Sequence, residues 1–69
     1  GMSMVQVAEG GLNEIGNIII RMRELGIQAA SDTVGANERS FIDKEIQQLK
    51  SELERISKVT TWGKTKLLD

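Results

Sequence analysis

The stretch VQVAEGGLNEIGNIIIRM (residues 5–22) decides the fold, because its apolar side chains recur three and four residues apart. The same spacing returns after a polar gap in IDKEIQQLKSELERI (residues 42–56). Such spacing places an apolar stripe along each helix and packs the helices together. The sequence therefore predicts an all-α fold, a hairpin of two long helices with coiled-coil or bundle packing. The predicted packing seam consists of Leu12, Ile15, Ile19, Met22, Ile42, Ile46, Leu49, Leu53 and Ile56.

Local signals divide this single unit, residues 1–69, into two helices, a loop and a tail. We predict the first helix over about residues 3–30 and a small, polar loop over 31–37. The second helix is predicted over 38–58, with Asn37 as its N-cap. Residues 59–69 are rich in β-branched side chains and interrupted by a glycine, so we predict a short extended C-terminal tail with Trp62 as a packing anchor.

Two adjacent glycines, Gly10 and Gly11, lie inside the first predicted helix. Each lowers helix stability by about 1 kcal/mol relative to alanine. They mark either a weak N-terminal turn or a close approach of another backbone, which glycine permits. The sequence leaves both interpretations open.

Composition excludes several classes of function. The 69 residues contain neither cysteine nor histidine, which removes disulfides, common zinc sites and nucleophile–imidazole pairs. Nine basic residues balance ten acidic ones, so a nucleic-acid partner has no electrostatic basis. The longest wholly apolar run, residues 18–20, is too short to span a membrane, and no signal peptide is visible. We predict no catalytic, cofactor or metal site, and therefore no enzyme.

The first helix carries more apolar surface than one partner can cover. At about 100° per residue, Ile18 and Leu25 flank the seam on one side, while Ile20 and Ile27 lie on the other. Other helices must cover them, from a parent chain or from other copies. The pattern begins close to the first residue, and the apolar residues Leu67 and Leu68 lie next to the chain end, so we expect a piece of a longer protein.

The stretches VAEGGLNEI (7–15) and IRMRELGIQAASD (20–32) carry a family resemblance. They resemble bacterial flagellin, whose pattern reads AEGALNE and then RMRELAVQAAND. The similarity continues through residues 42–49 and 52–56, and residues 60–68 resemble the family's TxFNGxKLL segment. The chain departs from the pattern at Gly11 and Gly26, where alanine is common, and at 62–64, where Trp-Gly-Lys replaces Phe-Asn-Gly.

The resemblance implies a structural subunit of the flagellar filament, located outside the cell and exported without a cleaved signal peptide. This region would belong to the N-terminal part of the inner helical core. Its implied partners are other flagellin subunits and a C-terminal helix of the parent chain. A generic coiled-coil adaptor is the alternative that does not depend on the resemblance.

The resemblance also implies recognition by the flagellin-sensing Toll-like receptor. The family's recognition positions correspond to Arg21, Leu25 and Glu45, and Gln28 lies one turn beyond Leu25. Arg21, Leu25 and Gln28 would form an exposed ridge away from the main seam. Ile20 stands where the family often has glutamine. The plainer interpretation is that this ridge packs filament subunits together, and both roles can hold.

Overall fold

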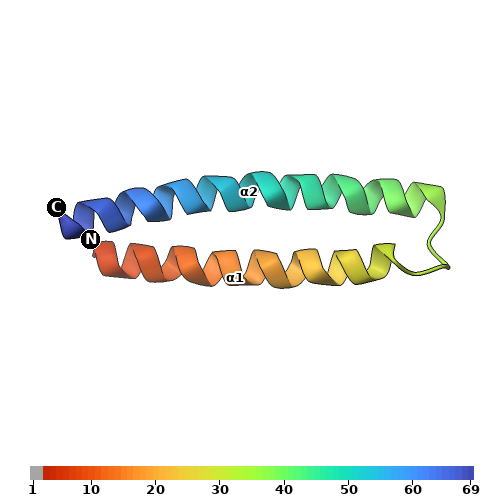
Figure 1. Cartoon of the computed structure of the whole chain (residues 1–69), viewed down its shortest axis with the longest axis horizontal. Helices are drawn as coiled ribbons and strands as arrows, with labels where there is room; N and C mark the ends of the chain where they lie inside the picture. Colours follow the sequence, from red (N-terminus) through yellow and green to blue (C-terminus); the bar gives the residue numbers. More distant parts are fainter. Residues whose placement is uncertain (1–2) are drawn as a thin grey trace.

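Two antiparallel helices of unequal length form the whole of the described structure, which is a computed structural model covering residues 3–69 (Figure 1). Helix α1 runs over Met4–Ala29 and helix α2 over Ala36–Leu68. The rod measures 51 × 18 × 15 Å, which matches the roughly 50 Å expected for a 33-residue helix. The predicted all-α hairpin is confirmed.

The start of α1 is set by a capping box. The Ser3 hydroxyl accepts a hydrogen bond from the Gln6 backbone N–H at 3.1 Å, and the Gln6 side chain accepts one from the Ser3 N–H at 3.1 Å. These bonds satisfy two of the donors that a helix start leaves free. At the other end the Ala30 N–H donates to the Gly26 and Ile27 carbonyls, which closes the helix.

The start of α2 differs from the prediction. Gly35, not Asn37, is the N-cap, with an extended backbone and no side-chain cap bond. Helix α2 begins one residue before Asn37. Asn37 therefore already lies within the first turn, together with Glu38. In the connecting loop the Ser31 hydroxyl accepts from the Thr33 N–H and lies 2.8 Å from the Thr33 hydroxyl, a local bond pattern that favours a turn over a helix.

The predicted extended tail is wrong, because α2 continues through residues 59–68 to Leu68. The added turns lie beside the start of α1, where Thr60 is half-buried and Gly63 is buried. This packing outweighs the weak helix preference of the β-branched residues. Trp62 is therefore not an anchor of a turn. It is a helical residue that is 59% exposed, with the Lys66 ammonium 5.8 Å from its ring centroid.

The interface between the helices follows strict seven-residue repeats. On α2 the positions that face α1 include every predicted seam residue, each buried or half-buried. The repeats on α2 are Ile42, Leu49, Ile56 and Gly63, and Ile46, Leu53 and Thr60. The repeats on α1 are Met4, Gly11, Ile18 and Leu25, and Ala8, Ile15, Met22 and Ala29. This is the periodicity of helices packed along a common seam.

On α1 the predicted seam is partly wrong. Of the two rows of residues that make up the seam, one is shifted by one residue from the row that the structure buries. Leu12 is 62% exposed and Ile19 is 50% exposed, so neither packs against α2. Ile18 and Leu25, predicted to be flanking residues, are instead 9% and 1% exposed and form the core. The spacing could not separate the two alternatives, because both lines on α1 are apolar and only one of them can face a single neighbouring helix.

Candidate interaction surface

The four predicted recognition residues lie together on one side of the hairpin. Arg21 on α1 reaches across to Glu45 on α2, with its Nε and Nη2 atoms 3.2 and 3.1 Å from the same carboxylate oxygen. Arg21 also pairs with Glu24 one turn along its own helix, at 3.3 Å. The hydrogen bond with Glu45, more than the one with Glu24, raises the pKa of Arg21 above its ordinary value. The ion pair therefore connects the two helices on their exposed surface.

A shallow groove of about 290 Å³ surrounds this ion pair. It is lined by Arg21, Leu25, Gln28, Glu38, Phe41, Ile42 and Glu45. Leu25 is 1% exposed, so the prediction that it forms part of an exposed ridge is wrong. It supports the groove from below, where its side chain belongs to the interhelical core. Arg21, Gln28 and Glu45 remain at the surface.

Sequence reasoning missed Phe41 and Glu38 as members of this groove. Phe41 is 69% exposed, and the Lys44 ammonium lies 6.0 Å from its ring centroid. The spacing contained the signal, because Phe41 lies four residues before Glu45 and shares its face of the helix. An exposed aromatic ring beside an arginine is the composition that protein interfaces favour.

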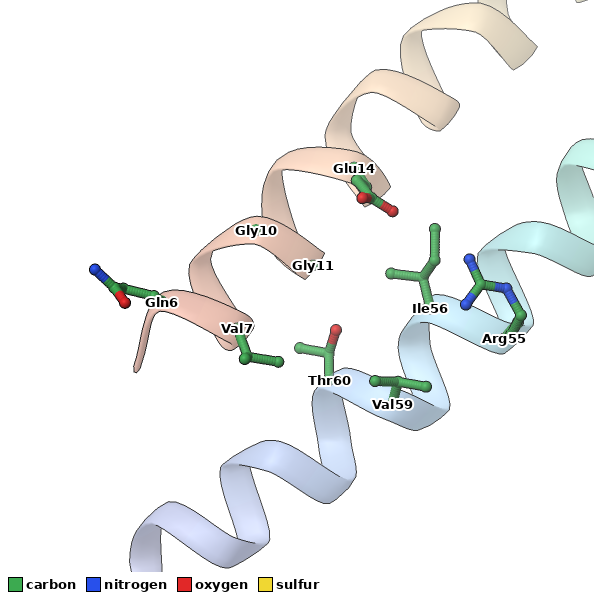
Figure 2. A pocket seen from close by; sticks show the side chains of 9 residues that line it. All are labelled: Gln6, Val7, Gly10, Gly11, Glu14, Arg55, Ile56, Val59 and Thr60. Atoms are coloured by element: carbon green, nitrogen blue, oxygen red, sulfur yellow. The ribbon is translucent and has the colours of Figure 1, made fainter. Parts of the chain in front are cut away.

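A second groove, of about 330 Å³, lies toward the chain ends on the same side of the hairpin. Figure 2 shows its lining: Gln6, Val7, Gly10, Gly11, Glu14, Arg55, Ile56, Val59 and Thr60. The two glycines leave α1 without side chains at this point. On the α2 side of the groove Val59 is 47% exposed, while Ile56 is buried and Thr60 is half-buried. Glu14 and Arg55 point toward each other from the two helices at one end of the groove (Figure 2). Arg55 forms its ion pair with Glu52.

Both grooves lie on one face because their residues follow the same repeats. Val7, Glu14, Arg21 and Gln28 are seven residues apart on α1, and Glu45, Glu52 and Val59 are seven apart on α2. Apart from the residues of the interhelical seam, the side chains of this face are largely polar. It carries all three ion pairs seen in residues 3–69, which join Arg21 to Glu24 and Glu45, and Arg55 to Glu52.

The opposite side of α1 carries several uncovered apolar side chains. Ile20 and Ile27, expected to need cover from other helices, are 58% and 69% exposed, and Leu12 and Ile19 lie beside them. Exposed apolar side chains that follow one another along a helix mark a contact surface. Over the described part of the chain, neither helix is apolar for long enough to cross a membrane. The hairpin therefore has one grooved polar face and one apolar face.

Comparison with known proteins identifies relatives for the whole chain. The family model of the bacterial flagellin N-terminal helical region matches residues 1–69. Flagellin A of Vibrio anguillarum is 45% identical over all 69 residues, which are 18% of that protein. Flagellin of Clostridium tyrobutyricum is 44% identical over 68 residues, 18% of its length. Flagellin of Halalkalibacterium halodurans is 42% identical over 69 residues, 25% of its length.

The chain thus spans about a fifth to a quarter of the curated relatives it matches. None of the solved structures matches it. The similarity covers both helices and the loop between them, so it includes the grooved face and the apolar face alike.

Proposed function

The chain belongs to the bacterial flagellin family, within its N-terminal helical region, and from this we propose that it serves as a structural element of the flagellar filament outside the cell. The observation that carries the proposal is the uncovered apolar face of α1. Leu12, Ile19 and Ile27 are 50–69% exposed, although side chains of this kind are normally covered by another element. A filament supplies such cover through its neighbouring helices.

Two sources of cover are available in this proposal. A helix from the C-terminal part of the parent polypeptide packs on the apolar face of α1, and neighbouring subunits contact the remaining surface. Filament growth needs heterologous contacts, in which one face meets a different face on the next copy. The hairpin has two such unlike faces, one apolar and one polar with grooves. The role is one of non-covalent assembly.

The experiment is an exchange of this region into the flagellin of a motile bacterium whose own filament gene is deleted. We expect filaments by electron microscopy and restored swimming. Ile19→Asp should prevent filament formation while the subunit is still exported, because it places a charge on the apolar face. Gln47→Asp is the matched control, since it adds the same carboxylate at an exposed site on α2. Normal filaments from the Ile19 variant would contradict the proposal.

We also propose, as a second role, recognition of the grooved face by the flagellin-sensing Toll-like receptor. The supporting observation is that Arg21, Gln28 and Glu45 line one groove together with the exposed ring of Phe41. Arginine and aromatic side chains are the residues that most often dominate binding energy at an interface. The same groove can pack against another subunit in the filament, since the receptor would meet the free monomer.

A receptor reporter assay on the free protein tests this role. Arg21→Ala, Glu45→Ala and Phe41→Ala should each reduce signalling, whereas Lys58→Ala on the far side of α2 should not. Circular dichroism must show unchanged helix content in every variant. Leu25→Ala is not informative here, because Leu25 lies in the core and its loss would weaken the fold. Full signalling by all three groove variants would exclude this role without affecting the filament proposal.

A further inference from the structure

Met4 is the first residue of α1 and the end of one line of the interhelical seam. It continues the seven-residue repeat of Gly11, Ile18 and Leu25, so it faces α2 and not the bare side of α1. Its Cε atom lies 3.5 Å from the position that a Cβ on Gly63 would occupy. Gly63 is buried although it has no side chain of its own. The thioether of Met4 therefore helps to cover the α2 backbone at Gly63.

The turns of α2 beside Met4 have little helical preference of their own. Residues 59–65 include four β-branched side chains and a glycine, so their helical structure depends on packing against α1. The backbone N–H and C=O groups of these turns already bond to one another within the helix. A polar group introduced at the Met4–Gly63 contact would therefore be placed against apolar surroundings without a hydrogen-bond partner, which is unfavourable.

We propose that Met4 is an oxidation site whose sulfoxide releases the last turns of α2, and that reduction of the sulfoxide restores them. The oxidant is a peroxide, of which hydrogen peroxide is the simplest. The Met4 sulfur donates an electron pair to one peroxide oxygen, the O–O bond breaks, and the other oxygen leaves as water. The sulfur is oxidised by two electrons and the peroxide is reduced by two. The product is a polar, chiral side chain that disrupts apolar contacts.

Position in the helix distinguishes Met4 from Met22, the other methionine of the seam. Both are half-buried, but Met22 lies within one turn of the buried residues Ile18 and Leu25. Exposing its sulfur fully requires opening the centre of the interhelical core. Met4 lies in the first turn of α1, and helix ends open far more readily than helix interiors. Peroxide should therefore reach Met4 first.

This modification site lies inside the hairpin. It needs no free surface on α1, because a helix that covers the bare side of α1 would leave the contact between Met4 and Gly63 in place. The inference goes beyond the proposed function and does not depend on it.

Peroxide treatment of the 69-residue chain, followed by tandem mass spectrometry of its peptides, tests the site. Met4 should gain one oxygen at least about tenfold faster than Met22, because opening the end of the helix costs less than opening its centre. In enough urea to unfold the chain the two rates should agree within about twofold, since neither side chain is then protected. Equal rates for Met4 and Met22 in the folded chain would overturn the assignment.

Amide hydrogen exchange tests the consequence. Met2→Leu/Met22→Leu leaves Met4 as the one methionine of the chain. Complete oxidation of this variant should raise exchange over residues 61–67 about tenfold and leave exchange over residues 42–56 unchanged. Treatment with methionine sulfoxide reductases for both epimers, with a thiol as reductant, should restore slow exchange.

The matched control adds Met4→Leu to the same background, which keeps an apolar side chain at residue 4 but removes the sulfur. The same peroxide treatment should leave its exchange over residues 61–67 unchanged. Slow exchange that persists after complete oxidation of Met4, or an equal rise in the Met4→Leu control, would overturn the proposal.

Discussion

Gly11 of α1 lies directly against Thr60 of α2, and the absent Gly11 side chain is what lets the helices meet there. A Cβ at Gly11 would overlap the Thr60 hydroxyl and would lie 3.3 Å from the Thr60 Cβ. Gly10, the preceding residue, has nothing within 4 Å of the corresponding position. The sequence could not tell a weak turn from a close approach of a neighbouring chain segment. The structure assigns the close approach to Gly11 alone.

Adjacent alanine substitutions should therefore change stability in opposite directions. Gly10→Ala should stabilise the hairpin by up to about 1 kcal/mol, because it improves helix propensity without a clash. Gly11→Ala should be about 1–3 kcal/mol less stable than Gly10→Ala, since the new methyl group displaces Thr60. Urea unfolding followed by circular dichroism measures both. Gly11→Ala/Thr60→Ala should recover most of the difference, and equal stability of the two single variants would contradict the close approach.

The displaced seam on α1 leads to a second prediction. Leu25→Ala should lower the free energy of unfolding by about 2–5 kcal/mol, because Leu25 is the most deeply buried side chain of the hairpin. Leu12→Ala on the same helix should change it by no more than about 0.5 kcal/mol, since Leu12 is 62% exposed. Unfolding should be measured at the lowest practical protein concentration, so that association does not contribute. A larger effect at Leu12 than at Leu25 would restore the seam first predicted from the sequence.

The Glu52–Arg55 pair gives the hairpin a specific dependence on pH. The hydrogen bond from Arg55 lowers the pKa of Glu52 below its ordinary value of 4.5. Since the folded-state pKa is the lower one, the pair contributes stability above pH 4.5 and loses it as the pH falls through the lowered value. NMR titration of the Glu52 carboxyl carbon should show this shift. Arg55→Gln should return the titration to its ordinary position, whereas Lys58→Gln should leave the lowered pKa unchanged.

How much of this structure was predictable differs between the two helices. On α2 the apolar residues form one stripe, so spacing alone identified Ile42, Leu49 and Ile56 as interface positions. On α1 three consecutive isoleucines offer two equivalent stripes, and only the position of the second helix selects Ile18 over Ile19. The prediction that the recognition residues share one surface came from the family resemblance. The burial of Leu25 and the exposure of Phe41 required the register of the interface, which spacing did not fix.

The C-terminal turns of α2 are the point where local preference and packing disagree most. Residues 59–65 contain four β-branched side chains and Gly63, a composition that favours extended structure. In the structure these turns are helical because they pack on the first turns of α1, where Thr60 meets Gly11 and a Cβ on Gly63 would lie 3.5 Å from the Met4 Cε. Local sequence cannot report contacts with residues that lie 49 and 59 positions away.

This explanation predicts that helicity after Val59 depends on Met4. Met4→Ala should increase amide hydrogen exchange over residues 61–67 and leave exchange in the middle of α2 unchanged, because the loss of packing is local. Gly63→Ala should slow that exchange and stabilise the hairpin by about 0.5–1 kcal/mol, since the new methyl group makes an ordinary contact and improves helix propensity. Gly26→Ala, whose Cβ would meet nothing within 4 Å, is the control: it should stabilise α1 without affecting exchange at the end of α2. Exchange over 61–67 at the rate of an unstructured peptide, both with and without Met4, would show that the tail is extended after all.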